Sequence, residues 1–81
     1  MTVEIIGNTA NVMSTAVFVG AQLEKYGITC TSFTSSTHFA NAKLSIYIKP
    51  SSKGKSYRLF KGICESTEVR SNFDVDIRVY L

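Results

Sequence analysis

One segment of this chain, residues 9–26, has the pattern of a helix, and this feature constrains the fold more than any other. Asn8 and Thr9 provide an N-cap at its start, and Gly27 suits its C-terminal cap. Residues 1–7 alternate between apolar and polar side chains and end at a glycine, which predicts a strand before the helix. The chain is therefore predicted to open as strand, turn and helix.

Most of the remaining chain has the alternating pattern of strands. The strictest alternation covers residues 73–81, where every second side chain is apolar. Further strands are predicted for residues 28–36, 44–49 and 56–63, with a turn at 50–55 and polar loops at 37–42 and 64–71. The predicted order is β-α-β-β-β-β. It describes a single α+β domain over residues 1–81, with one helix packed on a curved, mostly antiparallel five-stranded sheet.

One helix is too narrow to cover a sheet of this width. Five strands span about 20 to 24 Å, whereas a helix with its side chains is about 10 to 12 Å wide. The predicted core face of the helix holds Met13, Ala16, Val17 and Gly20, and Val12 and Leu23 flank it. Phe18 falls on the opposite face, as a candidate contact residue. Either the sheet curls around the helix, or a second copy or another partner covers the rest. We predict a homo-oligomer, and first of all a dimer.

Basic residues are concentrated in the middle of the chain. Residues 25–64 carry seven of the nine Lys and Arg residues and no Asp or Glu. One face of the predicted hairpin combines cations with aromatic rings, and its turn adds further lysines. The predicted partner-binding residues are Lys43, Tyr47, Lys49, Lys53, Lys55, Arg58 and Phe60.

This combination suits two classes of partner. A protein with an acidic surface would be steered to these cations, since complementary charge raises the association rate. Single-stranded DNA or RNA is the alternative, because rings stack on bases and cations contact phosphates. A solvated face with no partner is a third interpretation, since lysines commonly protect exposed strands. Protein binding is the leading hypothesis, and the polar segment 29–37 could add strand pairing along its edge.

A small-anion or nucleotide site is a second alternative function. Gly7, Asn8 and Thr9 form a strand-to-helix junction that resembles, in outline, the loops holding phosphates at helix starts. The match is weak, because a single glycine is present and the lysine of a phosphate-binding loop is missing.

Catalytic patterns are weaker still. His38 is the only histidine, and neither a metal-ligand spacing nor a nucleophile motif accompanies it. Asp74 and Asp76 share one side of the last predicted strand, where a solvated surface is the simpler explanation. We therefore predict a binding protein and not an enzyme, with no cofactor and no metal.

Targeting signals are not recognisable in the sequence. The longest apolar run, residues 16–21, is too short to span a membrane, and the first basic residue, Lys25, comes too late for a secretory signal. Cys30 and Cys64 have no metal-ligand spacing and are expected to be buried free thiols. These features predict a cytoplasmic protein without membrane contact. In size and composition the chain is similar to small virus- or phage-encoded inhibitors of host proteins.

Overall fold

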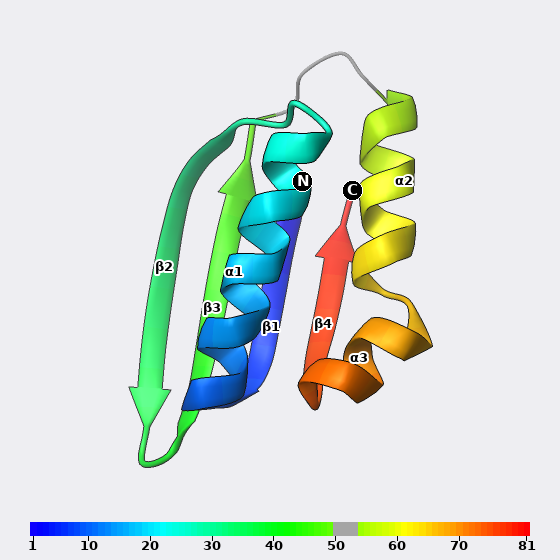
Figure 1. Ribbon diagram of the computed structural model, residues 1–81. Helices are drawn as coiled ribbons and strands as arrows, with labels where there is room; N and C mark the ends of the chain where they lie inside the picture. The colour runs from blue at the N-terminus through cyan, green and yellow to red at the C-terminus, as the bar shows by residue number, and fades with distance from the viewer. Residues whose placement is uncertain (50–53) are drawn as a thin grey trace.

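The computed structural model describes residues 1–49 and 54–81, and their elements are shown in Figure 1. In chain order the elements are β1 (Thr2–Asn8), α1 (Thr9–Lys25), β2 (Cys30–His38), β3 (Asn41–Ile48), α2 (Gly54–Cys64), α3 (Thr67–Phe73) and β4 (Val75–Tyr80). The predicted strand, turn and helix at the start of the chain are confirmed. Side-chain Oδ1 of Asn8 accepts a hydrogen bond from the amide of Ala10 at 2.9 Å, as expected of an N-cap.

The strands form one antiparallel sheet in the order β2-β3-β1-β4. β1 and β2 run in the same direction with β3 between them, and β3 and β4 run in the same direction with β1 between them. α1 makes the first of these connections, and α2 with α3 makes the second. This is the split βαβ arrangement. All of the described helices lie on one face of the sheet, which leaves the other face uncovered (Figure 1).

Residues 56–63, predicted as a strand, lie in α2. Tyr57, Phe60 and Cys64 are buried, and their spacings of three and four residues place them on one face of a helix. The same short segment also alternates, and such segments are compatible with both periods. The predicted hairpin is therefore wrong, and the sheet has four strands among the described residues instead of five.

The predicted loop 64–71 contains most of a third helix. Ser66 begins it, because its hydroxyl oxygen accepts a hydrogen bond from the amide of Val69 at 3.2 Å. Asp74 ends it in the left-handed backbone region, with φ of 52°. α3 thereby returns the chain to β4 and places Phe73 against Phe18 of α1, with ring centroids 5.2 Å apart.

The buried face of α1 is shifted from the predicted one. Val12 and Leu23, predicted at its flanks, are buried together with Thr15 and Val19, while Met13 and Val17, predicted inside, are 64% and 75% exposed. Thr15 can enter the core because its hydroxyl donates a hydrogen bond to the carbonyl of Asn11 at 2.7 Å. The helix is apolar on several sides, and its packing against the rest of the fold, mainly β1 and β3, decides which side is buried.

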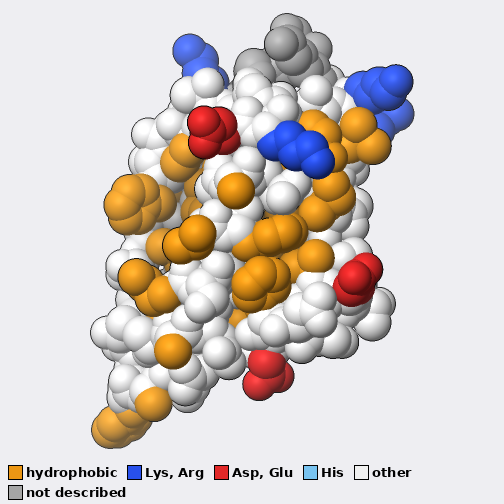
Figure 2. Space-filling model, viewed as in Figure 1, with side chains coloured by type: hydrophobic (Ala, Val, Ile, Leu, Met, Phe, Trp, Pro, Cys, Tyr) orange, Lys and Arg blue, Asp and Glu red, His pale blue; other side chains and the backbone are white. Residues whose placement is uncertain are grey.

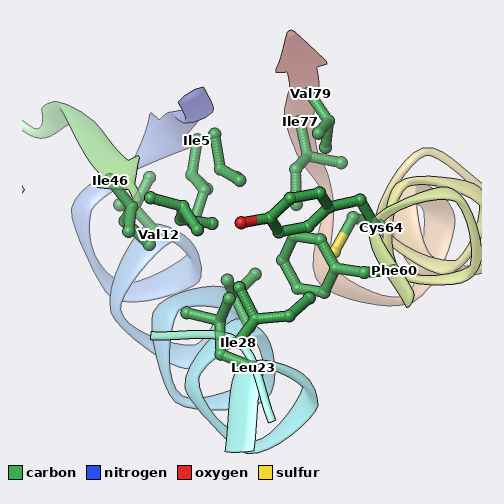
Figure 3. Packing of buried hydrophobic residues seen from close by; sticks show 13 residues of the cluster. Ile5, Val12, Leu23, Ile28, Ile46, Phe60, Cys64, Ile77 and Val79 are labelled. Atoms are coloured by element: carbon green, nitrogen blue, oxygen red, sulfur yellow. The ribbon is translucent and has the colours of Figure 1, made fainter. Parts of the chain in front are cut away.

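The core lies between the sheet and the helices (Figure 3). Phe60 and Cys64 of α2 pack toward Ile77 and Val79 of β4, and α1 contributes Leu23 and other residues from the opposite side (Figure 3). The elements share this core, so the described chain is one α+β unit. Within residues 1–49 and 54–81, no helix has the length and apolar character that a membrane crossing requires.

β2 lies outside the helical layer. All nine of its residues are exposed, including Phe33 at 70%. The two-residue turn that follows contains Phe39, whose φ is 57° and whose side chain is 91% exposed. The β2 edge of the sheet, and the side of β2 that faces the helical layer, are therefore open to solvent.

Candidate functional site

The predicted basic and aromatic face is not assembled in the structure. Lys43 and Tyr47 lie on β3 and point to the uncovered face of the sheet, because they pair with Ile6 and Thr2 of β1 in that register. Arg58 is exposed on α2, on the helical side of the molecule. Phe60 is fully buried in the core, so it offers no ring to a partner.

The other three predicted lysines are Lys49, Lys53 and Lys55, of which the structure describes the first and the last. Lys49 follows β3 and its carbonyl accepts a hydrogen bond from the hydroxyl of Tyr57. Lys55 is exposed in the first turn of α2. Lys53 lies outside the described residues. Lys49 is thus bonded to α2 and Lys55 belongs to it, so both are associated with α2 and not with the rings on the uncovered sheet face.

The uncovered sheet face carries two tyrosines and balanced charges. Tyr47 and Tyr80 both pair with Thr2, one on each side, and are 41% and 48% exposed. Lys43 forms an ion pair with Glu4 at 2.7 Å. Arg78 and Asp76 form a second pair at 3.0 Å. The face therefore has rings that could stack on a ligand, but its cations already have acidic partners.

The pKa directions agree with this pairing. A hydrogen bond from Lys43 is the main reason that the pKa of Glu4 is lowered, and the same bond raises the pKa of Lys43. The pKa of Arg78 is raised first by a hydrogen bond with Tyr80 and then by the charge of Asp76. A connected network therefore crosses β3, β1 and β4 on this face.

A hollow lies on the other side of the sheet, between α1 and the α2–α3 segment, and we call it the interhelical groove. Its volume is about 840 Å³. Figure 2 shows apolar side chains gathered in this hollow. Its apolar lining consists of Phe18, Leu59, Ile63, Val69 and Phe73. Two of these residues, Leu59 at 49% exposure and the half-buried Phe18, offer apolar surface to a ligand.

Charged groups lie at the ends of the interhelical groove. Lys25, in the last turn of α1, and Arg58, in α2, line it toward the end where α1 finishes and α2 begins (Figure 1). Glu68 of α3 lines it toward the opposite end. Among the described residues, neither Lys25 nor Arg58 forms an ion pair. Lys25 lies 5.7 Å from the ring centroid of Tyr26, a contact that leaves its charge available.

A second hollow, the α1–β2 groove, has a different chemistry. Its volume is about 420 Å³. Its lining consists of Met13, Ala16, Gly20, Leu23, Cys30, Phe33, Ser35, Leu44 and Ile46, and none of these residues is charged. The groove exists because α1 packs over β1 and β3 and stops short of β2.

The junction at Gly7, Asn8 and Thr9 uses its own hydrogen-bonding groups. The amide of Thr9 donates to the carbonyl of Ala40 at 2.9 Å, and the Thr9 hydroxyl donates to the same oxygen. Asn8 caps the amide of Ala10, as described above. At Gly7 a Cβ would lie 3.2 Å from a methyl group of Val75, so this glycine permits close packing of β4. The chain itself therefore occupies the amides of Thr9 and Ala10 and the hydroxyl of Thr9.

The residues considered for catalysis do not come together. His38 stacks edge-on against Phe39 at the exposed turn, with ring centroids 4.3 Å apart. Asp74 is an exposed helix cap, and Asp76 pairs with Arg78. No group of three or more metal-ligating side chains occurs among the described residues. Cys64 is buried as expected, but Cys30 is exposed on β2, contrary to the prediction.

The sequence matches no protein-family model, and no curated protein matches it at a significant level. The function must therefore be argued from the surfaces of the chain. Phe18 and Arg58 were predicted as contact residues and both line the interhelical groove. Leu59, Ile63 and Phe73 were missed, because the sequence placed them in strands. The spacing of Phe18, Gln22 and Lys25 on one helical face was the available signal.

Proposed function

We propose that this chain is a non-catalytic protein-binding module, whose interhelical groove accepts an amphipathic helix with acidic residues at one end. The observation that carries the proposal is an open apolar groove with two unpaired cations, Lys25 and Arg58, at one end. Helix-in-groove binding uses apolar anchors spaced by three and four residues, and a groove between two helices matches that geometry. An inhibitor or adaptor of another protein would work in this way.

The charges give the partner a direction. Glutamates at one end of the partner helix would meet Lys25 and Arg58, while that helix's other end would lie near Glu68. The cations contribute more to orientation and association rate than to affinity, because they are exposed. The apolar lining contributes the affinity, at about 25 cal/mol for each Å² that it buries.

Single-stranded nucleic acid remains the alternative, on the uncovered sheet face. Tyr47 and Tyr80 favour it, since a four-stranded sheet with exposed rings is a known platform for stacking bases. The ion pairs of Lys43 and Arg78 disfavour it, because they leave this face with no excess of positive charge.

The test uses a synthetic peptide of about 15 residues with leucines at helical spacing and glutamates in its first turn. A matched peptide replaces the glutamates by lysines. We expect amide shifts in NMR spectra only at residues lining the interhelical groove, and about tenfold weaker binding of the lysine peptide. The proposal would be overturned by shifts on β2 or on the uncovered sheet face, or by the absence of shifts at about 1 mM peptide. Equal affinities for the glutamate and lysine peptides would also overturn it.

Two glycines offer matched variants for the same titration. Gly62 lines the interhelical groove and Gly20 lines the α1–β2 groove, and a Cβ at either position meets no atom within 4 Å. Gly62→Phe should fill the interhelical groove and abolish peptide binding, while Gly20→Phe should leave it intact. Circular dichroism checks that both variants remain folded. Arg58→Glu should lower the affinity for the glutamate peptide and raise the affinity for the lysine peptide.

Self-association, which the sequence also predicts, is compatible with this site. The interhelical groove lies on the side of α1 that is next to α2 and α3, whereas β2 and its open edge lie on the other side of α1 (Figure 1). A second copy could therefore dock at β2 while the interhelical groove stays accessible.

A further inference from the structure

The two edges of the sheet differ in how well they are protected. At the β4 edge, Asp76 and Arg78 carry charges. The amide of Val79 points outward there and donates a hydrogen bond to Oε1 of Glu65 at 3.1 Å. Charged side chains and occupied amides are the usual means by which proteins prevent pairing at an edge strand. The β4 edge is therefore better protected against another strand than the β2 edge.

The β2 edge carries no charged side chain, and its one register irregularity among the described residues lies between Cys30 and Ser32, at the start of the strand. Its nine residues, Cys30–His38, include no Asp, Glu, Lys, Arg or Pro, and all nine are exposed. Among the described residues, the backbone of β2 pairs with β3 and with no other strand. A long, uncharged edge of this kind is a template for adding a further strand.

The helix side of β2 adds an apolar surface to this edge. Phe33 projects there, because it pairs with the core residue Ile46 of β3. Phe33 is 70% exposed, and Met13 of α1, which lines the same groove, is 64% exposed. An added strand would therefore form main-chain hydrogen bonds and also cover the uncharged α1–β2 groove.

We infer that the occupant of this edge is a second copy of the chain, whose β2 pairs with β2 antiparallel to make a continuous eight-stranded sheet. The interface is isologous, with a two-fold axis perpendicular to the sheet. The inference concerns a surface separate from the interhelical groove, so it can fail without affecting the proposed function.

Self-complementarity supports a second copy over a foreign strand. In a two-fold interface each strand pairs with an identical copy of itself. A charged edge strand would therefore bring like charges close together. β2 carries no charged residue and meets no such repulsion. Full overlap of the two strands places Thr34 opposite itself, since it is the central residue of Cys30–His38. The two Phe33 rings then lie diagonally across the pair, within reach of each other on the helix side.

The surface area that a stable dimer buries indicates that the α1–β2 groove is part of the interface. A nine-residue strand is about 30 Å long, and a sheet is about 10 Å thick, so strand pairing alone covers roughly 300 Å² on each copy. Specific interfaces bury about 1,200 Å² or more in total. Strand pairing alone falls short of that value, and covering Phe33, Met13 and the groove on both copies provides the remainder.

Light scattering of the purified chain, coupled to size-exclusion chromatography, tests the dimer with a matched pair of variants. Phe33→Asp places a charge on the proposed interface, and Leu81→Asp places one at a similarly exposed site beyond β4, where Leu81 is 68% exposed. We expect a dimer for the unmodified chain and Leu81→Asp, and a monomer for Phe33→Asp. A monomer at all concentrations up to about 1 mM, or a dimer that Phe33→Asp leaves intact, would overturn the inference.

Cysteine cross-linking tests the register independently. In a Cys30→Ser background, cysteine is placed in turn at positions 33, 34 and 35. Self-facing residues of an antiparallel pair have Cα atoms about 4.5 to 5.5 Å apart, within the span of a disulfide. One position, expected to be Thr34→Cys, should cross-link under mild oxidation, and Arg78→Cys on β4 should not. Equal cross-linking at all three positions, or only at position 78, would contradict antiparallel β2 pairing.

Discussion

The thiol of Cys64 is fully buried against the sheet, and its surroundings determine its chemistry. Burial, and then the negative charge of Glu65, raises the pKa of Cys64 from 9.0 to about 12. Cys30, on the exposed strand β2, has no such enclosure. Since the thiolate is the reactive form, the two cysteines should differ strongly in reactivity.

We predict that a thiol reagent at pH 8 labels Cys30 rapidly and Cys64 only when the chain unfolds. The protonated thiol is favoured in the folded state, so the stabilisation from Cys64 is complete below about pH 9 and is lost as the pH rises toward 12. The free energy of unfolding should fall by up to about 1.4 kcal/mol per pH unit in that range. Mass spectrometry and denaturant titrations measure both effects.

The Cys64→Ala variant is the control for this prediction. It should be less stable at neutral pH, because it leaves a cavity, but its stability should depend less on pH above 9. Equal labelling rates for both thiols in the folded chain would contradict the burial of Cys64.

At the residue level, periodicity identified many buried positions but not the buried side of α1. Alternation correctly indicated that Ile77 and Val79 face the core. Met13 and Val17 were expected inside and are exposed, while Thr15 of the same helix is buried. The hydrogen bond that allows Thr15 to be buried follows from helix geometry, but the way in which α1 packs against β1 and β3 does not follow from the sequence of α1 alone.

At the level of elements, Glu65 joins the end of α2 to β4. Its carboxylate accepts hydrogen bonds from the ammonium group of Lys61 and from the amide of Val79. Burial alone would raise the pKa of Glu65, but these bonds and the charges of Lys61 and Arg70 outweigh it, and the pKa is lowered. The carboxylate is therefore most favourable in its ionised form.

We predict that Glu65→Gln lowers the free energy of unfolding by about 1 kcal/mol at pH 7, because the amide cannot form the ion pair. The stabilisation by Glu65 is present above its unfolded pKa of about 4.5 and is lost as the pH falls below it. The difference between the variant and the unmodified chain should therefore disappear in acid. Denaturant titrations between pH 3 and 7 provide the measurement, and a constant difference would contradict it.

The sequence predicted four elements from their periodicity, and β2 from its run of β-branched and hydroxyl residues. β1, α1, β2, β3 and β4 all match segments that were assigned correctly to within a few residues. α2 was missed because its short pattern fits two periods, and the turn residues before it favoured a hairpin. The candidate site depended on this assignment. Phe18 and Arg58 were identified singly, but their groove could not be predicted while α2 and α3 were taken as a strand and a loop.

For the whole molecule, the distribution of charge matters more than the net value of +3. Unpaired cations, including Lys25, Lys55 and Arg58, gather where α1 ends and α2 begins (Figure 1). The uncovered sheet face instead pairs Lys43 with Glu4 and Arg78 with Asp76. The exposed tyrosines of the sheet face are thus separated from these cations, whereas single-strand binding on that face needs both together.

We predict no binding of a single-stranded oligonucleotide tighter than about 100 µM at about 50 mM salt, because the face with exposed rings is near neutral. Fluorescence anisotropy with a labelled thymidine oligomer provides the measurement. Binding that weakens steeply with salt and is lost in Tyr47→Ala would favour the nucleic-acid alternative. Binding that survives Tyr47→Ala would point to non-specific attraction by the basic end.

The hydrogen bond between Glu65 and the amide of Val79 also limits the size of any assembly. A sheet with two open edges could add copies indefinitely, β2 of one chain to β4 of the next, and would grow into a filament. In this chain the carboxylate of Glu65 occupies an amide at the β4 edge, so the inferred pairing through β2 uses the less protected edge and favours two copies over a filament. A side chain at the end of a helix thus bears on whether such an assembly stays finite.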